Sequence, residues 1–473
     1  MLFRIREAGQ TLHAAYVKER LEQASVPVSD TIKGNNMLTF ANQLDSKKKG
    51  TKDSGVQRQN MMLVTQLFLS LQSRPDADMK DFFRFENQRQ PPSLADQGLL
   101  RSGTKSDILK CLNAPTGRSA AAKQATVVVL DMAAVIHMVR PTTANTFSEY
   151  VSFHIVPYLE AQITSSTKRI DAVWDNYPEE NNLKALTQQR RGNGPRTRVG
   201  DGSTPIPKHD WNSGFLKNEE NKKELFSFIS TQISKNHMGG TLLLSTCFET
   251  VLSNQHCDFT TLQPCNHSEA DTRILLHLAH AAEQGHTKAY VRTVDSDVVV
   301  LTIPFFESLS LSELWVGFGT GKNYRDIPVH TIYSDLGPSK SLALPLFHSL
   351  TGCDTTSQFL GCGKKTAWAA WTSIPDLTDT LVALTHDPDL FSLESVHMQR
   401  LERFVIVMYS KGCGAASVNA ARHQLFTTGS KLLENIPPRQ AALFQHVKRA
   451  LLQASFYWRQ ATSVQQEIPD FIE

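Results

Sequence analysis

The sequence predicts an α/β fold with a mainly parallel central sheet flanked by helices. Short apolar, often β-branched runs recur between residues 126 and 306, and segments with helix-like apolar spacing separate them. Several of these runs end in an acidic residue. Strands that alternate with helices form βαβ units, whose strands lie parallel in one sheet. In such a sheet, ligands bind beyond the carboxyl ends of the strands.

The expected elements follow in chain order. Four runs predict strands: TVVVLD (126–131), RIDAVWD (169–175), TLLLST (241–246) and KAYVRTV (288–294). Helical spacing predicts helices at 147–163, from 176 to about 191, at 221–235 and at 269–284. A further apolar run occupies 298–306. Pro157 leaves open whether the segment 147–163 forms one helix or two.

The regions on either side of this pattern differ from it. We expect residues 1–120 to form an irregular helical extension, because the polar stretch DSKKKGTKDSGVQRQN (45–60) has the composition of a flexible connector. Modest helical patterns follow it at MMLVTQLFLSLQ (61–72) and KSDILKCL (105–112). The α/β pattern occupies 121–372. Residues 373–473 predict a helical C-terminal region, with helices at 395–410, 417–429 and 440–458.

Composition indicates an intracellular globular protein. The net charge is +3, and no apolar run approaches the roughly 18 residues of a membrane helix, so no membrane partner is expected. Seven cysteines, an odd number without a secretory signal, favour a reducing compartment. His256, Cys257, Cys265 and His267 are irregularly spaced for a zinc site. We interpret that segment as a polar loop.

Seven acidic residues in five short patches carry the functional prediction. They are Asp131, Asp175, Glu269, Asp271, Asp295, Asp297 and Asp354. Three of the patches follow predicted strands, so a parallel sheet would bring them to one edge. Carboxylates beside buried segments are costly unless their charge is compensated. Mg²⁺ and Mn²⁺ prefer such oxygen ligands, and two ions together suit phosphodiester hydrolysis. We therefore expect two Mg²⁺ or Mn²⁺ ions here.

Each patch also has a structural explanation. The segment 268–271 precedes the apolar face of a predicted helix and fits an N-terminal capping box. Asp295 and Asp297 fit a turn, and so do residues 352–354. Taken singly the patches are weak signals, and their combination in this order is the stronger one.

The order of the patches resembles the flap endonuclease branch of the PIN-like nuclease superfamily. The matching features are an acid ending the first strand, VWD before a basic stretch, EAD at a helix start, DSD after a strand, and GCD before Gly-x-Gly. The resemblance spans about 125–372, and its most specific part is Asp354 followed by Gly361-Cys362-Gly363-Lys364-Lys365. It implies a metal-dependent nuclease whose seven acids are the metal ligands. The chain also resembles animal proteins associated with mobile elements.

The resemblance further implies nucleic-acid contacts from two segments. The stretch after Asp175 would form a helical arch over the metals, in which Lys184 and Arg191 orient the scissile phosphate. The remaining nucleic-acid contacts would come from Arg190, Arg196, Arg198, Gly361, Gly363, Lys364 and Lys365. Positive charge beside the acids would also draw a polyanion toward them. The alternative for the arch segment is a solvated basic loop.

The chain departs from this family in ways that leave the substrate's shape open. About 125 residues precede the first catalytic strand, the segments 199–240 and 304–345 are additional, and Thr355 stands where the family often has an aromatic residue. We expect a structure-selective nuclease that acts on DNA in preference to RNA, in the nucleus. One alternative is a catalytically inactive nucleic-acid-binding module with the same fold. Another is a ribonuclease H-like transposase, which would need an antiparallel hairpin after its first acidic strand.

Overall fold

The computed structural model describes residues 5–28, 62, 65–70, 72–74, 78–86, 90–177, 194–428 and 433–467. The chain divides into two compact units, Met1–Met61 and Met62–Glu473. In the first, helix α1 (Ile5–Val17) continues into the π-helical turn η2 (Lys18–Glu22). The connector expected at 45–60 lies outside the described residues. The boundaries expected at 120 and 372 both fall inside the second unit.

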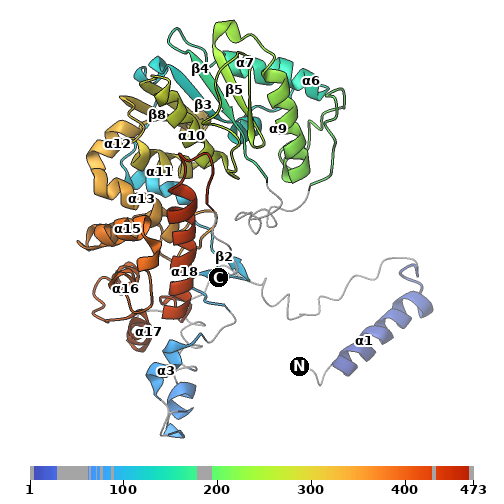
Figure 1. The fold of residues 1–473 in the computed structure, drawn as a ribbon. Helices are drawn as coiled ribbons and strands as arrows, with labels where there is room; N and C mark the ends of the chain where they lie inside the picture. The colour runs from blue at the N-terminus through green and yellow to red at the C-terminus, as the bar shows by residue number, and fades with distance from the viewer. Residues whose placement is uncertain are drawn as a thin grey trace. The chain divides into compact units, whose positions relative to one another are not determined.

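The second unit is built on a seven-stranded sheet in the order β6-β5-β4-β3-β7-β8-β9. Figure 1 labels β3, β4, β5 and β8 of this sheet. The strands are β3 (Val127–Asp131), β4 (Arg169–Val173), β5 (Leu242–Cys247), β6 (Thr250–Ser253), β7 (Lys288–Thr293), β8 (Glu313–Phe318) and β9 (Arg325–Pro328). The five inner strands are parallel, and β6 and β9 are antiparallel to their neighbours at the two edges. The prediction of an α/β fold with a mainly parallel sheet is confirmed.

Strand β3 occupies the centre of the sheet, and its sequence explains its burial. Its five side chains are all buried. Val127 and Val129 pack in one hydrophobic cluster, whereas Val128 and Leu130 pack in another. Alternate residues of a strand point to opposite faces, so a continuous apolar run fits a strand that is covered on both sides.

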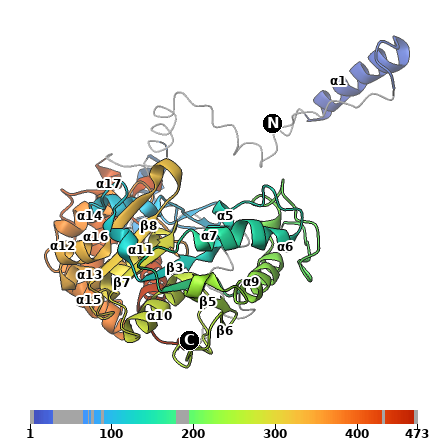
Figure 2. The same cartoon turned by 90° about the horizontal axis from the view of Figure 1, so that it is seen from above.

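One face of the sheet is covered by helices from the first half of the unit (Figure 2). These are α5 (Met132–Met138), α6 (Phe147–Tyr150), α7 (Val156–Glu160) and α9 (Glu219–Ile233). A π-helical turn, η5 (Val151–Ile155), joins α6 to α7 immediately before Pro157. The segment 147–160 is therefore one helical run, and the widened turn lies where the proline lacks an amide hydrogen.

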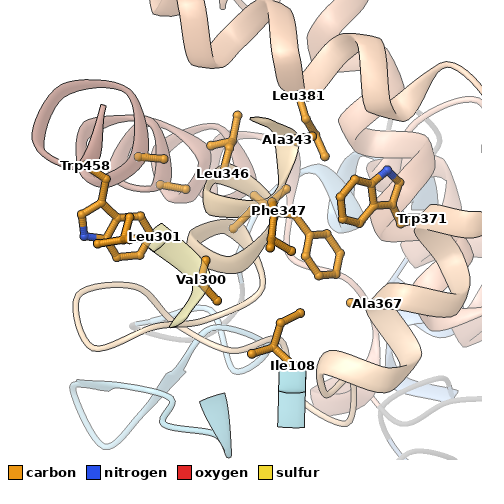
Figure 3. Close-up of a cluster of buried hydrophobic side chains, with 14 of the residues drawn as sticks. Ile108, Val300, Leu301, Ala343, Leu346, Phe347, Ala367, Trp371, Leu381 and Trp458 are labelled. Carbon is orange, nitrogen blue, oxygen red and sulfur yellow. The ribbon is translucent and has the colours of Figure 1, made fainter. Parts of the chain in front are cut away.

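Helices from the second half of the unit lie on the other side of the sheet. They are α10 (Ala270–Glu283), α11 (Ser296–Phe305), α12 (Val329–Leu336), α13 (Pro338–Leu350), α14 (Lys364–Thr372), α15 (Leu377–His386), α16 (Val396–Tyr409), α17 (Val418–Thr427) and α18 (Gln440–Leu451). Helices α10 and α12 contact the strands, and the others extend the helical layer outward (Figure 1). Phe347 of α13 is fully buried and stacks on Trp371 with ring centroids 4.5 Å apart (Figure 3). The C-terminal helices thus share one hydrophobic core with the sheet.

The remaining elements of this unit are short. They are α3 (Met79–Arg84), β1 (Ala95–Asp96), β2 (Leu99–Leu100), η3 (Lys105–Asp107), α4 (Ile108–Cys111), η4 (Ala121–Gln124), η6 (Phe215–Lys217), η7 (Met238–Gly240), η8 (Gly321–Asn323), η9 (Pro388–Leu390), η10 (Leu433–Asn435) and η11 (Leu452–Trp458). Among the described residues, no helix has both the length and the apolar character needed to cross a membrane.

Candidate metal centre

The predicted acidic residues come together at the carboxyl edge of the sheet. One cavity of about 240 Å³ is lined by six of them, namely Asp131, Asp175, Glu269, Asp271, Asp295 and Asp354. The seventh, Asp297, lies beside the cavity, because one of its oxygens is within 4.8 Å of oxygens from Asp271 and Asp295. The five patches are therefore neighbours in space although 223 residues separate the first from the last (354 − 131).

Asp131 is held in place by two hydrogen bonds. It ends β3 and caps α5, accepting from the Ala134 amide at 3.0 Å and from the Thr293 hydroxyl at 2.7 Å. Burial, followed by the neighbouring charge of Asp175, raises the pKa of Asp131 to about 6. A carboxylate in this environment favours a nearby positive charge.

A hydrogen bond links Asp175 to the start of α10. Asp175 follows β4 and accepts a hydrogen bond from the Ala270 amide at 2.9 Å, thereby satisfying one of the unpaired amides at the start of α10. Glu269 is the N-cap residue, but its side chain makes no capping hydrogen bond. The N-cap is therefore Glu269 rather than Ser268, and Glu269 lines the cavity.

Asp295 and Asp297 belong to the first turn of α11 rather than to an isolated turn. Asp295 is the N-cap and accepts from the Asp297 amide at 2.9 Å. Asp297 is buried, and its Oδ1 lies 3.1 Å from Nε2 of His348 on α13. Burial lowers the pKa of His348 to about 4, so the neutral ring donates its Nε2–H to the carboxylate.

Asp354 comes from the loop between α13 and α14. Gly352 in that loop has φ +107°, and a Cβ there would lie 2.9 Å from the backbone of Gln358. Glycine is needed at this position because the two backbone segments approach closely. The tight turn brings Asp354 to the mouth of the same cavity.

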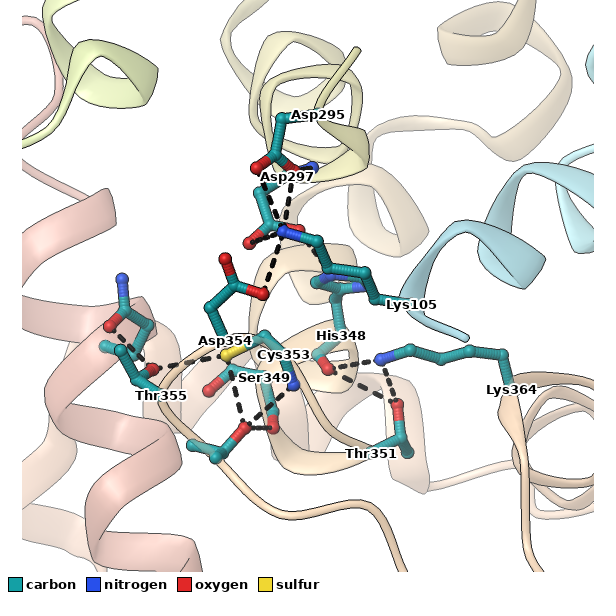
Figure 4. A network of polar contacts seen from close by, with 12 residues as sticks. Lys105, Asp295, Asp297, His348, Ser349, Thr351, Cys353, Asp354, Thr355 and Lys364 are labelled. Atoms are coloured by element: carbon teal, nitrogen blue, oxygen red, sulfur yellow. Dashed lines mark hydrogen bonds and ion pairs between the residues drawn. The ribbon is translucent and has the colours of Figure 1, made fainter. Parts of the chain in front are cut away.

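Lys105 places a positive charge among these acids, and the sequence reasoning missed it. Its ammonium nitrogen lies 2.8 Å from Asp295 Oδ1, 3.2 Å from Asp297 Oδ2 and 3.0 Å from Asp354 Oδ1 (Figure 4). The predicted helix at 105–112 forms η3 and α4. Its local pattern does not distinguish Lys105 from Lys110, whose side chain is 59% exposed. Only the tertiary structure reveals the difference.

The donor set suits a hard divalent cation. Asp271, Asp295 and Asp297 are the one group of three or more His, Cys, Asp or Glu side chains, within the described residues, arranged to hold a metal ion. Carboxylate oxygens are what Mg²⁺ and Mn²⁺ prefer. The ammonium of Lys105 already serves as a cation for two of these acids. The hydrogen bond from His348 to Asp297 is of the kind that orients metal-binding carboxylates.

The predicted arch residues are only partly described. Lys184, Arg190 and Arg191 lie outside the described residues. Arg196 pairs with Glu224 at 2.9 Å, and Arg198 is exposed.

A lysine of helix α9, unlike these two arginines, lines the acidic cavity. Lys222 of α9 lines the cavity together with Tyr177 and His137. Its ammonium is 4.5 Å from the centroid of the Tyr177 ring. The sequence reasoning passed over Lys222 because it belongs to an ordinary amphipathic helix.

The structure corrects the prediction that Lys364 contacts nucleic acid. Its side chain is only 4% exposed, and its ammonium donates to the His348 carbonyl at 2.6 Å and to the Thr351 hydroxyl at 2.9 Å. A lysine turned inward in this way satisfies the end of α13 and does not present its charge to a phosphate. Lys365, Gly361 and Gly363 lie at the exposed or half-exposed start of α14. Gly361 has φ +75°, which favours glycine.

The cysteine and histidine patch forms no metal site among the described residues. Cys265 packs in a small hydrophobic cluster. His267 is buried, and its Nε2 lies 2.7 Å from the Ser463 carbonyl.

No family model matches the chain, and no curated protein matches it in a sequence search. Function is therefore inferred from the site itself.

Proposed function

We propose that the chain is a metal-dependent nuclease that hydrolyses phosphodiester bonds, with DNA as the preferred substrate. The observation that supports this most is the gathering of six carboxylates from separate segments around one cavity at the carboxyl edge of a parallel sheet. An acidic cavity of this kind repels a polyanion unless cations are bound, so its chemistry requires positive charge.

The acids would bind the metal, and neighbouring groups would orient the acids through hydrogen bonds. Mg²⁺ or Mn²⁺ bound there would supply activation of a water and stabilisation of the leaving oxygen. His348 orients Asp297, and the hydrogen bonds from Thr293 and Ala134 orient Asp131. Fixed carboxylates are what a catalytic metal site needs, because small displacements of the reacting groups are costly in rate.

Positive and aromatic groups on the cavity wall would receive the substrate. Lys222 would bind a phosphate oxygen, and Tyr177 beside it offers a flat ring for a base. Neither group reads the edge of a base pair, which fits selectivity for the form of the nucleic acid rather than its sequence. The nuclear location expected for a DNA nuclease is part of the same proposal.

The strand connections favour the PIN-like interpretation over the transposase. The first acidic strand, β3, is followed by helix α5, and both of its neighbours are parallel to it. A ribonuclease H-like fold would have an antiparallel hairpin at this point. The inactive binding module retains the same fold, so only an activity measurement separates it from the nuclease.

That measurement is cleavage of labelled single-stranded DNA, flap DNA and RNA by the purified chain in Mg²⁺ or Mn²⁺. We expect cleavage by the wild type. Asp295→Asn/Asp297→Asn should reduce the rate on the order of 10²- to 10³-fold or more, because several kcal/mol of charge stabilisation are lost. Binding of the same substrate should persist.

The matched control is Asp335→Asn, which neutralises an exposed aspartate on α12. It should cleave at the wild-type rate. Binding without cleavage by the wild type, in either metal, would identify the inactive module instead.

A further inference from the structure

The acids of the cavity fall into two groups according to their relation to Lys105. Asp295, Asp297 and Asp354 surround its ammonium at 2.8–3.2 Å (Figure 4). They come from the start of α11 and from the loop after α13. The other four acids come from β3, the segment after β4 and the start of α10. Asp271 lies where the groups meet, since one of its oxygens is within 4.8 Å of oxygens from Asp295 and Asp297.

The position of Lys105 is fixed by the packing of its own segment. The next turn, α4, buries Ile108 and Leu109 completely and contacts α14. The Lys105 amide donates to the Gly103 carbonyl at 3.0 Å. Its side chain is 23% exposed. The packing of this segment therefore holds Lys105 beside Asp295, Asp297 and Asp354.

An ammonium and a divalent ion compete for the same oxygens. Mg²⁺ requires carboxylate oxygens at about 2.0–2.1 Å in a nearly octahedral arrangement. A second cation hydrogen-bonded to those oxygens would lie only a few ångströms from the ion, where repulsion in a partly buried site is strong.

We propose that the Lys105 ammonium takes the place of one of two divalent cations, so that the chain binds a single Mg²⁺ or Mn²⁺ in the acidic cavity. This inference rests on the proposed nuclease function and changes its expected ion count from two to one. The ammonium neutralises three acids as an ion would, because each of its three N–H donors can face one of them.

The test is the number of Mn²⁺ ions bound per chain, measured by titration calorimetry on the metal-free full-length protein. Lys105→Met and Lys105→Gln remove the ammonium, and Lys110→Met is the control, because it removes a charge from the same short segment at an exposed position. We expect one ion for the wild type and for Lys110→Met, and two for each Lys105 variant. Mn²⁺ should also raise the melting temperature of the Lys105 variants more than that of the wild type.

The inference is overturned if the wild type binds two ions or none, or if the Lys105 variants bind the same number as the wild type. Variants that fold only when Mn²⁺ is present support it, because the ion then replaces the lost ammonium. Variants that stay unfolded in saturating Mn²⁺ overturn it. Failure of the nuclease proposal is separate: it appears as absence of cleavage by the wild type, whatever the ion count.

Discussion

Individual lysine side chains offset the negative charge of the acidic cavity. Lys222 lies near the N-terminal end of α9. Its side chain lines the cavity, and its ammonium lies over the Tyr177 ring. Lys105 approaches from a different segment and pairs with acids. The two lysines bring positive charge to the acids from separate segments, and the proposed function assigns the substrate phosphate to Lys222.

Lys222→Ala should weaken nucleic-acid binding and reduce its dependence on salt. Each phosphate contact with a single strand contributes about 0.7 to the slope of log K against log salt concentration. We expect the slope for single-stranded DNA to fall by roughly this amount. The affinities are measured by fluorescence anisotropy across a series of salt concentrations, in the background of Asp295→Asn/Asp297→Asn.

Lys235→Ala, which removes an exposed lysine just beyond the other end of α9, serves as the control. Its slope should equal that of the parent. An unchanged slope for Lys222→Ala would show that Lys222 contacts no phosphate.

Lys364 shows why residue roles are harder to predict than residue positions. The resemblance of the segment Gly361-Cys362-Gly363-Lys364-Lys365 predicted a phosphate contact at Lys364, whereas its ammonium donates to the His348 carbonyl and the Thr351 hydroxyl. Whether a lysine turns outward or inward depends on where α13 ends relative to α14, and this packing leaves no trace in the local sequence. Lys105 was missed for the same reason.

At the scale of elements, the sequence was most informative where one strand is buried on both faces. The runs of β3, β4, β5 and β7 are mostly buried and rich in apolar or β-branched residues, and each was predicted within a few residues. The convergence of Asp131, Asp175 and Asp295 followed from their parallel direction. Strands β6, β8 and β9 were not predicted. The edge strands β6 and β9 have only four residues each, and β8 lies in the segment 304–345 that was interpreted as an addition.

Helix α18 is attached to the end of α13 by a buried polar contact. Nε2 of His446 lies 2.8 Å from the Leu350 carbonyl, and its ring is 5.0 Å from that of Phe359. Burial lowers the pKa of His446 to about 4. The unfolded chain binds the proton near its usual pKa of about 6.5, so protonation favours unfolding.

The lowered pKa of His446 predicts that the folded protein loses stability in mild acid. The contribution is fully present above pH 6.5 and is lost as the pH falls toward 4. Between pH 7 and pH 5 it amounts to about 2 kcal/mol of unfolding free energy. His446→Gln cannot titrate, so its stability should fall less over this range than that of the wild type. Denaturant unfolding at each pH measures the difference, and parallel pH profiles would contradict the prediction.

At the scale of the whole molecule, the C-terminal helices complete the core that supports the acidic cavity. Leu381 on α15, Phe404 on α16 and Leu443 on α18 are fully buried in the same cluster as the sheet residues Val129 and Val291. That cluster also surrounds α13, which carries His348 behind Asp297. A boundary at 372 would therefore cut through one continuous core.

A fragment of residues 62–372 should consequently fail to fold. Each fully buried large apolar side chain contributes about 1.5–3 kcal/mol, and loss of even five exceeds much of the roughly 5–15 kcal/mol that typically stabilises a domain. The fragment should lack a cooperative melting transition and should bind no Mn²⁺. The comparison fragment, 62–473, omits only the separate first unit and should melt at the temperature of the full chain. A cooperative transition in the shorter fragment would show that the sheet and its acids are stable without α15–α18, and would support a domain boundary at 372.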